Sequence, residues 1–173
     1  MASKQHTCCF FGHRKIENEE ELGERLKSIV EDLITNKKVD TFLFGSKSEF
    51  NSLCRVVVSE LREKYPHIKR IYVRAEYPEI TEHYKEYLLE DYEDTYYPER
   101  IVNAGRAVYA ERNCEMIDNS AWCVAYYNEN YAPQRRRTAK NSVLPTCQPN
   151  SGTKRAYDYA KRKGTKIINT YLG

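Results

Sequence analysis

Glycine and polar residues directly follow several of the apolar runs in this sequence, where they could bind an anion. They are Gly12, His13 and Arg14 after the first run, Gly45 and Ser46 after the second, Arg74 at the end of the third, and Ser151, Gly152 and Thr153 before a late amphipathic stretch. Glycine lets the backbone approach an anion closely, while hydroxyl and guanidinium groups donate hydrogen bonds to it. Free amides at a helix start add further donors. These residue types predict a phosphate-binding site.

Each of these features also has a plain structural interpretation. Ser151, or the Gly45-Ser46 turn, could simply cap a helix N-terminus. Arg14 could be a surface cation, and His13 could close the end of a strand. Because several such turns are expected at one edge of the sheet, a ligand-binding site is nevertheless the favoured interpretation.

A basic run precedes Ser151 and consists of Arg135, Arg136 and Arg137. A run of this kind is typical of a solvated loop. Its position before the Ser151-Gly152-Thr153 turn also suits a lid that closes over an anionic ligand. Both interpretations are consistent with the sequence.

The elements that must position these residues alternate along the chain. Five β-rich runs are expected, at 6–11, 40–44, 68–74, 121–127 and 166–169. Five amphipathic helices are expected between them, at 18–36, 49–65, 81–89, 104–117 and 152–163. Asn18 is the predicted N-cap of the first helix, Tyr84, Tyr87 and Leu88 are the predicted inward residues of the third, and Gly164 is the predicted stop of the last.

Strands that alternate with helices predict an α/β, Rossmann-like fold with three α/β/α layers and a mainly parallel sheet of about five strands. Residues 1–173 are expected to form one domain with an irregular basic loop at 128–150. Ligands of such sheets bind beyond the carboxyl ends of the strands. The polar turns should therefore meet at that edge.

Composition excludes several classes of protein. The net charge of +3 does not indicate a general nucleic-acid coat, and no apolar run is long enough to cross a membrane. The six cysteines form no CxxC pair and no cluster with zinc-binding spacing, so no bound metal is expected. We expect a cytoplasmic protein whose cysteines are reduced thiols. The opening MASKQHT lacks the apolar segment of a signal peptide.

The segment 76–100 is strongly acidic and rich in tyrosine. It holds nine acidic and two basic residues together with six tyrosines. This composition is typical of a solvated helix face over a tyrosine-lined core. A contact in a homodimer or larger homo-oligomer is the alternative interpretation, because tyrosine is enriched at interfaces.

Phe10-Phe11-Gly12-His13-Arg14 resembles the opening motif of the YpsA-like branch of the SLOG superfamily. Three further stretches are similar and occur in the same order: FGSKSEFNSLC, ERNCEMIDNSAWCVAYY and SGTKRAYDYAKRKGTKIIN. The resemblance covers about residues 6 to 170. It implies a Rossmann-like fold that binds a nucleotide or a nucleotide-derived signal.

The superfamily includes the Lonely-guy phosphoribohydrolases, which release a base from a nucleoside monophosphate. Their arginine helix is similar to Glu111-Arg112-Asn113 followed by Met116, so the resemblance implies that Arg112 and Asn113 face the ligand. Their catalytic glutamate, however, falls at the position of Ala156. Alanine can neither activate water nor stabilise an oxocarbenium ion. Glu76 or Glu49 is left as an alternative source of a carboxylate.

The sequence thus favours a module that binds or senses a nucleotide, an ADP-ribose-like compound or a cyclic nucleotide, with no further cofactor required. A nucleoside 5'-monophosphate N-glycosidase is the alternative, so enzymatic activity is left open with a preference for binding alone. Single-stranded nucleic-acid binding is a second and less favoured alternative, because the acidic segment would repel a strand. A scaffold with an unused cavity is also consistent with the sequence.

Overall fold

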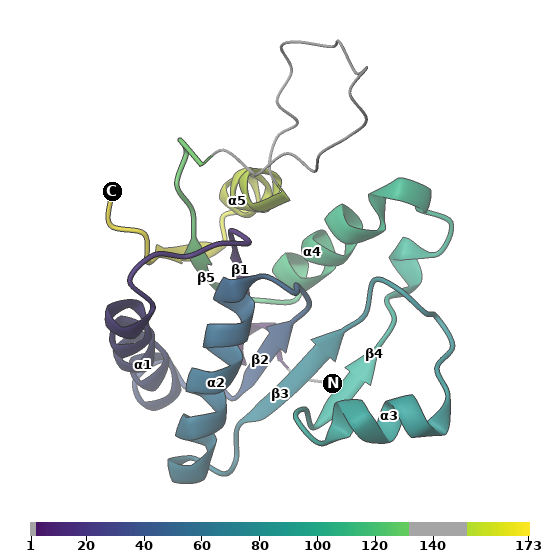
Figure 1. Cartoon of the computed structure of the whole chain (residues 1–173), viewed down its shortest axis with the longest axis horizontal. Helices are drawn as coiled ribbons and strands as arrows, with labels where there is room; N and C mark the ends of the chain where they lie inside the picture. The colour runs from purple at the N-terminus through teal and green to yellow at the C-terminus, as the bar shows by residue number, and fades with distance from the viewer. Residues whose placement is uncertain (1–2, 132–151) are drawn as a thin grey trace.

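Six parallel strands form one sheet, and helices cover both of its faces (Figure 1). The computed structural model describes residues 3–131 and 152–173. The strands lie in the order β4-β3-β2-β1-β5-β6, and every neighbouring pair is parallel. This is the predicted α/β, Rossmann-like architecture. Four residues considered from the sequence lie outside the described residues: Arg135, Arg136 and Arg137 of the basic run, and Ser151.

The described part of the chain contains one more strand than the five that we predicted. The strands are β1 (Thr7–Gly12), β2 (Thr41–Phe44), β3 (Lys69–Val73), β4 (Asp94–Tyr96), β5 (Trp122–Tyr126) and β6 (Lys166–Asn169). The additional strand, β4, is short, polar and at an edge, so it has no apolar pattern to reveal it. Backbone pairing with β3 and a hydrogen bond from the Thr95 hydroxyl to the Tyr72 carbonyl hold it in place.

The helices follow the predicted order. They are α1 (Glu19–Thr35), α2 (Glu49–Lys64), α3 (Glu82–Leu89), α4 (Val108–Asp118) and α5 (Gly152–Arg162), with short 3-10 helices at Lys4–His6, Glu99–Ile101 and Gly105–Ala107. Gly164 has a φ of +70° and ends α5, as predicted.

One local prediction is confirmed in part and another is wrong. Asn18 is the N-cap residue of α1, as predicted, but its backbone is left-handed and its side chain makes no capping hydrogen bond. Tyr87 does not point inward: its side chain is 62% exposed. Of the three predicted inward residues of α3, only Leu88 is buried, because this short helix lies beside the sheet edge.

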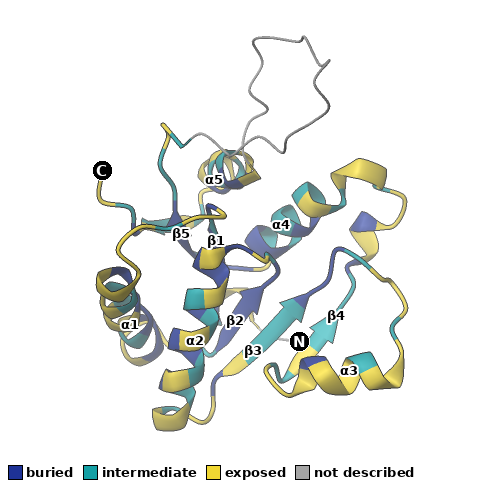
Figure 2. Cartoon of the chain, viewed as in Figure 1, coloured by how far each residue is buried: buried dark blue, intermediate teal, exposed yellow. Residues whose placement is uncertain are grey.

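Alternate residues of each strand pack on opposite faces of the sheet. In β1, Cys8 and Phe10 join the core under α1 and α2, whereas Cys9 and Phe11 join the core under α4 and α5. Figure 2 shows β2 dark blue between the helix layers, whereas β3 and β4 towards the edge are mostly teal. Because both faces of the central strands β1, β2 and β5 are covered, these strands are continuous apolar runs in the sequence.

The direction of strand addition reverses at β1. From β1 the chain adds β2, β3 and β4 on one side, and β5 and β6 on the other. The loops that follow β1 and β5 therefore diverge at the carboxyl edge of the sheet. Such a reversal opens the crevice in which doubly wound proteins bind ligands.

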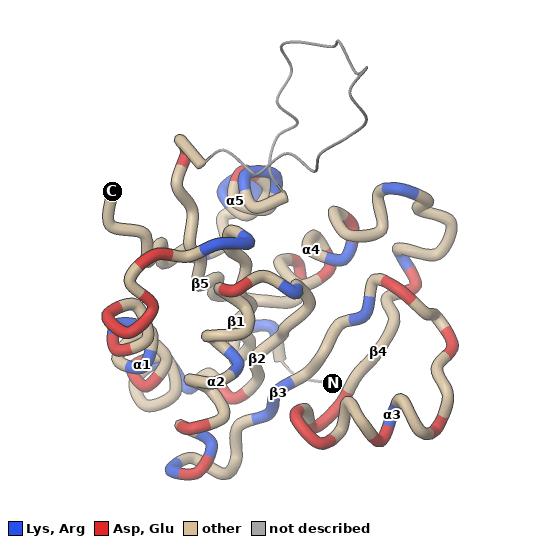
Figure 3. The backbone as a smooth tube through the Cα atoms, in the orientation of Figure 1, with Lys and Arg blue, Asp and Glu red and all other residues tan. Residues whose placement is uncertain are grey.

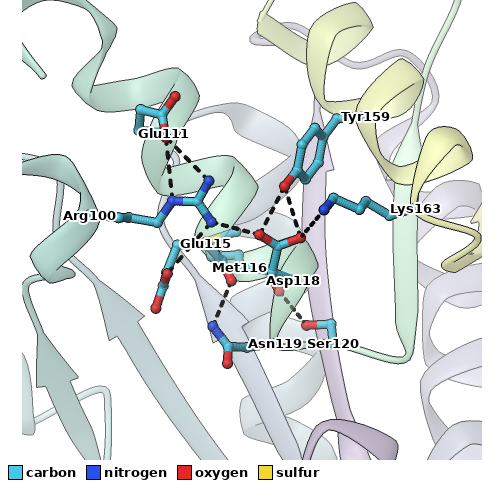
Figure 4. Close-up of polar contacts among 9 residues, drawn as sticks. All are labelled: Arg100, Glu111, Glu115, Met116, Asp118, Asn119, Ser120, Tyr159 and Lys163. Carbon is cyan, nitrogen blue, oxygen red and sulfur yellow. Dashed lines mark hydrogen bonds and ion pairs between the residues drawn. The ribbon is translucent and has the colours of Figure 1, made fainter.

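A polar cluster between α4, α5 and the 3-10 helix Glu99–Ile101 fixes the helix layer on one side of this crevice (Figure 4). Asp118 accepts a hydrogen bond from Arg100 at 2.7 Å and from the Tyr159 hydroxyl at 2.8 Å. Arg100 also pairs with Glu111, at 3.2 Å. Burial alone would raise the pKa of Asp118, but the hydrogen bonds from Arg100 and Tyr159 hold it below its ordinary value of 3.8.

Asp118→Asn should lower the free energy of unfolding by about 1–2 kcal/mol at pH 7, because it removes a charged hydrogen-bond acceptor. The lowered pKa of Asp118 fixes the sign of the pH dependence. Its contribution is complete above the unfolded-state pKa and is lost as the pH falls through the folded-state pKa. Urea unfolding at pH 7 and near pH 3 should therefore show a gap between wild type and variant that closes in acid. A gap of equal size at both pH values would contradict this assignment.

Candidate functional site

A cavity of about 960 Å³ opens at the carboxyl ends of β1, β2 and β3. Ten of the eleven predicted binding residues are described, and all ten line it: Gly12, His13, Arg14, Gly45, Ser46, Arg74, Arg112, Asn113, Gly152 and Thr153. The eleventh, Ser151, lies outside the described residues, as do the three arginines of the predicted lid, Arg135, Arg136 and Arg137. The structure thus brings together turns that are far apart in the sequence.

Arg112, on α4, is the most unusual side chain of the cavity. It is 5% exposed, and one of its terminal nitrogens donates to the carbonyl of Gly45 while Nε donates to Asn113 Oδ1 at 3.3 Å. Among the described residues no carboxylate lies within 4.0 Å of its guanidinium. Burial lowers the pKa of Arg112, and the nearby Tyr72, Tyr109 and Glu76 offset part of that effect. A buried cation that contacts no carboxylate is unfavourable, and a ligand phosphate would supply the missing contact.

Gly45 allows this packing of Arg112. A Cβ atom at position 45 would lie 2.6 Å from Arg112 Cδ and 2.9 Å from Met116 Sδ. Any side chain at position 45 would displace Arg112. The glycine after β2 therefore leaves room for the Arg112 side chain, and it also lets a ligand approach the backbone.

Arg74 lines the cavity, but its donors are used by the protein. Nε donates to the Tyr77 carbonyl at 3.3 Å, and the terminal nitrogens donate to Thr95 Oγ1 at 3.1 Å and to the Pro78 carbonyl at 3.4 Å. Tyr77 has a φ of +60°, which is uncommon for a bulky residue. Arg74 therefore anchors a strained loop after β3 and shapes the wall of the cavity.

His13 joins the two loops that diverge at the strand reversal. Its Nε2 lies 2.8 Å from the backbone N of Asn128, and its ring stacks on Tyr131 with the centroids 3.9 Å apart. Burial lowers the pKa of His13, so the ring is neutral at pH 7. His13 lines the cavity, but these contacts make it chiefly a brace between the loops.

The two helix N-termini at the cavity differ in how their amides are used. At α2, the N–H of Glu49 donates to the Arg14 carbonyl at 2.9 Å, and the Asn51 N–H donates to Ser48 Oγ at 3.1 Å, so Ser48 is the cap. At α5, the N–H groups of Gly152 and Thr153 have no acceptor among the described residues. An anion therefore finds free donors at α5 and few at α2.

The lining is basic and aromatic. Its cations are Arg14, Lys15, Lys47, Arg74 and Arg112, and its tyrosines are Tyr72, Tyr77, Tyr84, Tyr109 and Tyr131. The guanidinium of Arg112 lies 5.7 Å from the ring centroid of Tyr109. Tyrosine faces of this kind can stack on a planar base.

Glu76 is the one acidic residue of the described lining. Its carboxylate accepts a hydrogen bond from the hydroxyl of Tyr109 on α4. The other carboxylate considered from the sequence, Glu49, faces Lys15 and the N–H of Ile16 and does not line the cavity. Ala156 is 3% exposed within the core under α4 and α5, so it too lies outside the cavity lining.

Sequence reasoning missed most of the tyrosines and both lysines of the lining. Tyr109 had an available signal, because it lies one helical turn before Arg112 and therefore on the same face of α4. Tyr72, Lys15 and Lys47 had none beyond their proximity to strand ends.

Comparison with models of known protein families gives no match to this chain, and comparison with curated proteins gives no match either. Among the described residues, no helix has the length and apolar character required to cross a membrane.

Proposed function

We propose that this protein binds a phosphate-bearing, nucleotide-derived small molecule in the cavity at the carboxyl edge of its sheet. The observation that carries this proposal is Arg112, a buried guanidinium that has no carboxylate within 4.0 Å among the described residues and lines a basic cavity. The phosphate would lie between Arg112 and the amides of Gly152 and Thr153, which line the same cavity and have no acceptor among the described residues.

The rest of the ligand would lie against the aromatic wall. Tyr72 and Tyr109 flank Arg112 and offer ring faces for a base, because a nucleobase stacks on tyrosine with little regard to its identity. The volume of about 960 Å³ lies at the upper end of the range usual for small-molecule sites. The motifs that resemble the SLOG superfamily support the same proposal.

Calorimetric titration with paired ligands tests the proposal. AMP, ADP-ribose and a cyclic nucleotide are compared with adenosine, which lacks a phosphate. At least one phosphate-bearing compound should bind about 30-fold or more tightly than adenosine, since charge-assisted hydrogen bonds to the phosphate are worth about 2 kcal/mol or more. A thermal shift with the same compounds should rise in parallel. Equal affinity for adenosine and AMP would refute the phosphate site.

Glu76 supports a second candidate, the N-glycosidase. Glu76 places a carboxylate in the cavity lining, whereas Ala156, at the position of the catalytic glutamate in the similar hydrolases, supplies none. A carboxylate in this position could stabilise the positive charge that develops on the ribose as the base departs.

Chromatography of nucleoside monophosphates incubated with the protein distinguishes the two functions. If the protein is an N-glycosidase, wild type should release free base, and Glu76→Gln should lower the rate about 1000-fold while AMP binding persists. Glu49→Gln is the matched control, because that carboxylate lies outside the cavity lining. Absence of free base from wild type leaves binding as the sole function.

A further inference from the structure

The two ends of the sheet carry opposite charges. β4 is the strand at one end and β6 the strand at the other. The acidic edge consists of the exposed Glu82, Glu86 and Glu90 of α3 and its flank together with Asp94 of β4. The basic edge consists of the exposed Lys161 and Arg162 of α5 and Lys166 of β6. Figure 3 shows the red residues around α3 and the blue residues along α5.

These charges are not used within the described part of the chain. None of the four carboxylates of the acidic edge and none of the three cations of the basic edge has an ion-pair partner there. Lys161, Arg162 and Lys166 lie over the rings of Tyr157, Tyr159 and Trp122 instead. Both edges therefore present solvated charge that a partner of opposite sign would neutralise.

Protection of the sheet edges does not account for this arrangement. Charged side chains commonly prevent open edge strands from pairing with other chains. Acidic or basic side chains can each protect an edge strand, and a mixture of the two would protect it equally well. The excess of acid beside β4 and of base beside β6 is a further property. It persists when the exposed Lys85 of α3 and the exposed Asp158 of α5, which pairs with Lys154, are counted. It makes one edge the electrostatic complement of the other.

Charge also decides the symmetry of the contact. A two-fold dimer built through a single edge would place acidic edge on acidic edge or basic edge on basic edge, and like charges repel. A head-to-tail contact joins opposite charges. On the acidic side, Tyr87 is 62% and Leu89 is 40% exposed, which adds apolar surface beside the carboxylates.

We propose that a second copy of this chain docks its basic edge on the acidic edge, so that copies associate head to tail. The contact leaves one edge free at each end, and further copies can add until a ring closes or a short chain forms. This inference is independent of the ligand-binding proposal, because the named residues of both edges lie outside the cavity lining.

Sedimentation velocity of the full chain tests the inference. In about 0.05 M NaCl the weight-average sedimentation coefficient should rise with protein concentration, and in about 0.5 M NaCl it should stay at the monomer value, because salt screens exposed charges. The variant Glu82→Lys/Glu86→Lys/Glu90→Lys and the variant Lys161→Glu/Arg162→Glu/Lys166→Glu should each weaken association about tenfold or more, since each reverses the sign of its edge and creates like-charge contacts.

The chain that carries all six reversals exchanges the signs of both edges, because only Asp94 keeps its original charge, and it should regain association. This rescue separates edge complementarity from a general effect of charge or from misfolding. The control is Lys27→Glu, an exposed residue of α1, which should associate as wild type does.

Three results would overturn the inference. One is a wild-type protein that stays monomeric at low salt and high concentration. Another is association that survives in both edge variants. The third is a monomeric protein that binds a single-stranded oligonucleotide through Lys161 and Arg162, which would assign the basic edge to nucleic acid.

Discussion

Arg112→Met should weaken binding of the phosphate-bearing ligand about 100-fold, because loss of a buried charged pair typically removes several kcal/mol of binding free energy. The fold should tolerate the change. Methionine fills much of the same volume, and the variant no longer buries a cation that contacts no carboxylate among the described residues. The loss of the hydrogen bond to Gly45 offsets that gain, so the free energy of unfolding should change by less than about 1 kcal/mol.

Calorimetry and urea unfolding on the same preparations measure both quantities. Lys27→Gln serves as the control, since it removes one positive charge from an exposed position on α1. It should leave both affinity and stability unchanged. If Arg112→Met binds as tightly as wild type, the arginine does not contact the phosphate. If it unfolds the protein, the arginine is primarily structural.

Gly12→Ala should destabilise the protein by about 2–3 kcal/mol, the effect expected when a methyl group is forced into a packed core. A Cβ atom at position 12 would lie 2.3 Å from Cδ1 and 2.8 Å from Cβ of Phe50. The Phe50 side chain is fully buried and cannot move aside easily. The requirement for glycine at the end of β1 is therefore steric, in addition to any role in approaching a ligand.

Gly152→Ala is the matched substitution at another glycine of the cavity. A Cβ atom there would have no neighbour within 4 Å among the described residues, and alanine favours a helix, so stability should rise by about 0.5 kcal/mol. Urea midpoints of the two variants should move in opposite directions. Equal destabilisation by both would show that the packing of Phe50 against Gly12 is not the cause.

The sequence was sufficient to predict the order of elements and the edge of the sheet at which polar turns meet. Phe10, Phe42 and Phe44 lie in short apolar runs bounded by glycine or polar residues, and such runs form buried parallel strands. Strand β4 escaped prediction because Asp94, Thr95 and Tyr96 are held by backbone pairing and not by an apolar face.

The residues that line the cavity were predictable, but their roles were not. Gly12, Arg112 and Gly152 meet because parallel strands end at one edge, which is a property of the topology. Whether a donor is free depends on its neighbours in space. Arg74 is committed to the loop after β3, whereas Arg112 keeps donor capacity for a ligand, and nothing in the local sequence separates the two.

Diffraction from crystals of the protein grown with AMP or ADP-ribose tests the central claim most directly. The account predicts phosphate oxygens about 3 Å from the Arg112 guanidinium and from the amide nitrogens of Gly152 and Thr153, with the base against Tyr72 or Tyr109. A phosphate that binds elsewhere, with Arg112 still facing only Gly45 and Asn113 at saturating ligand, would contradict it.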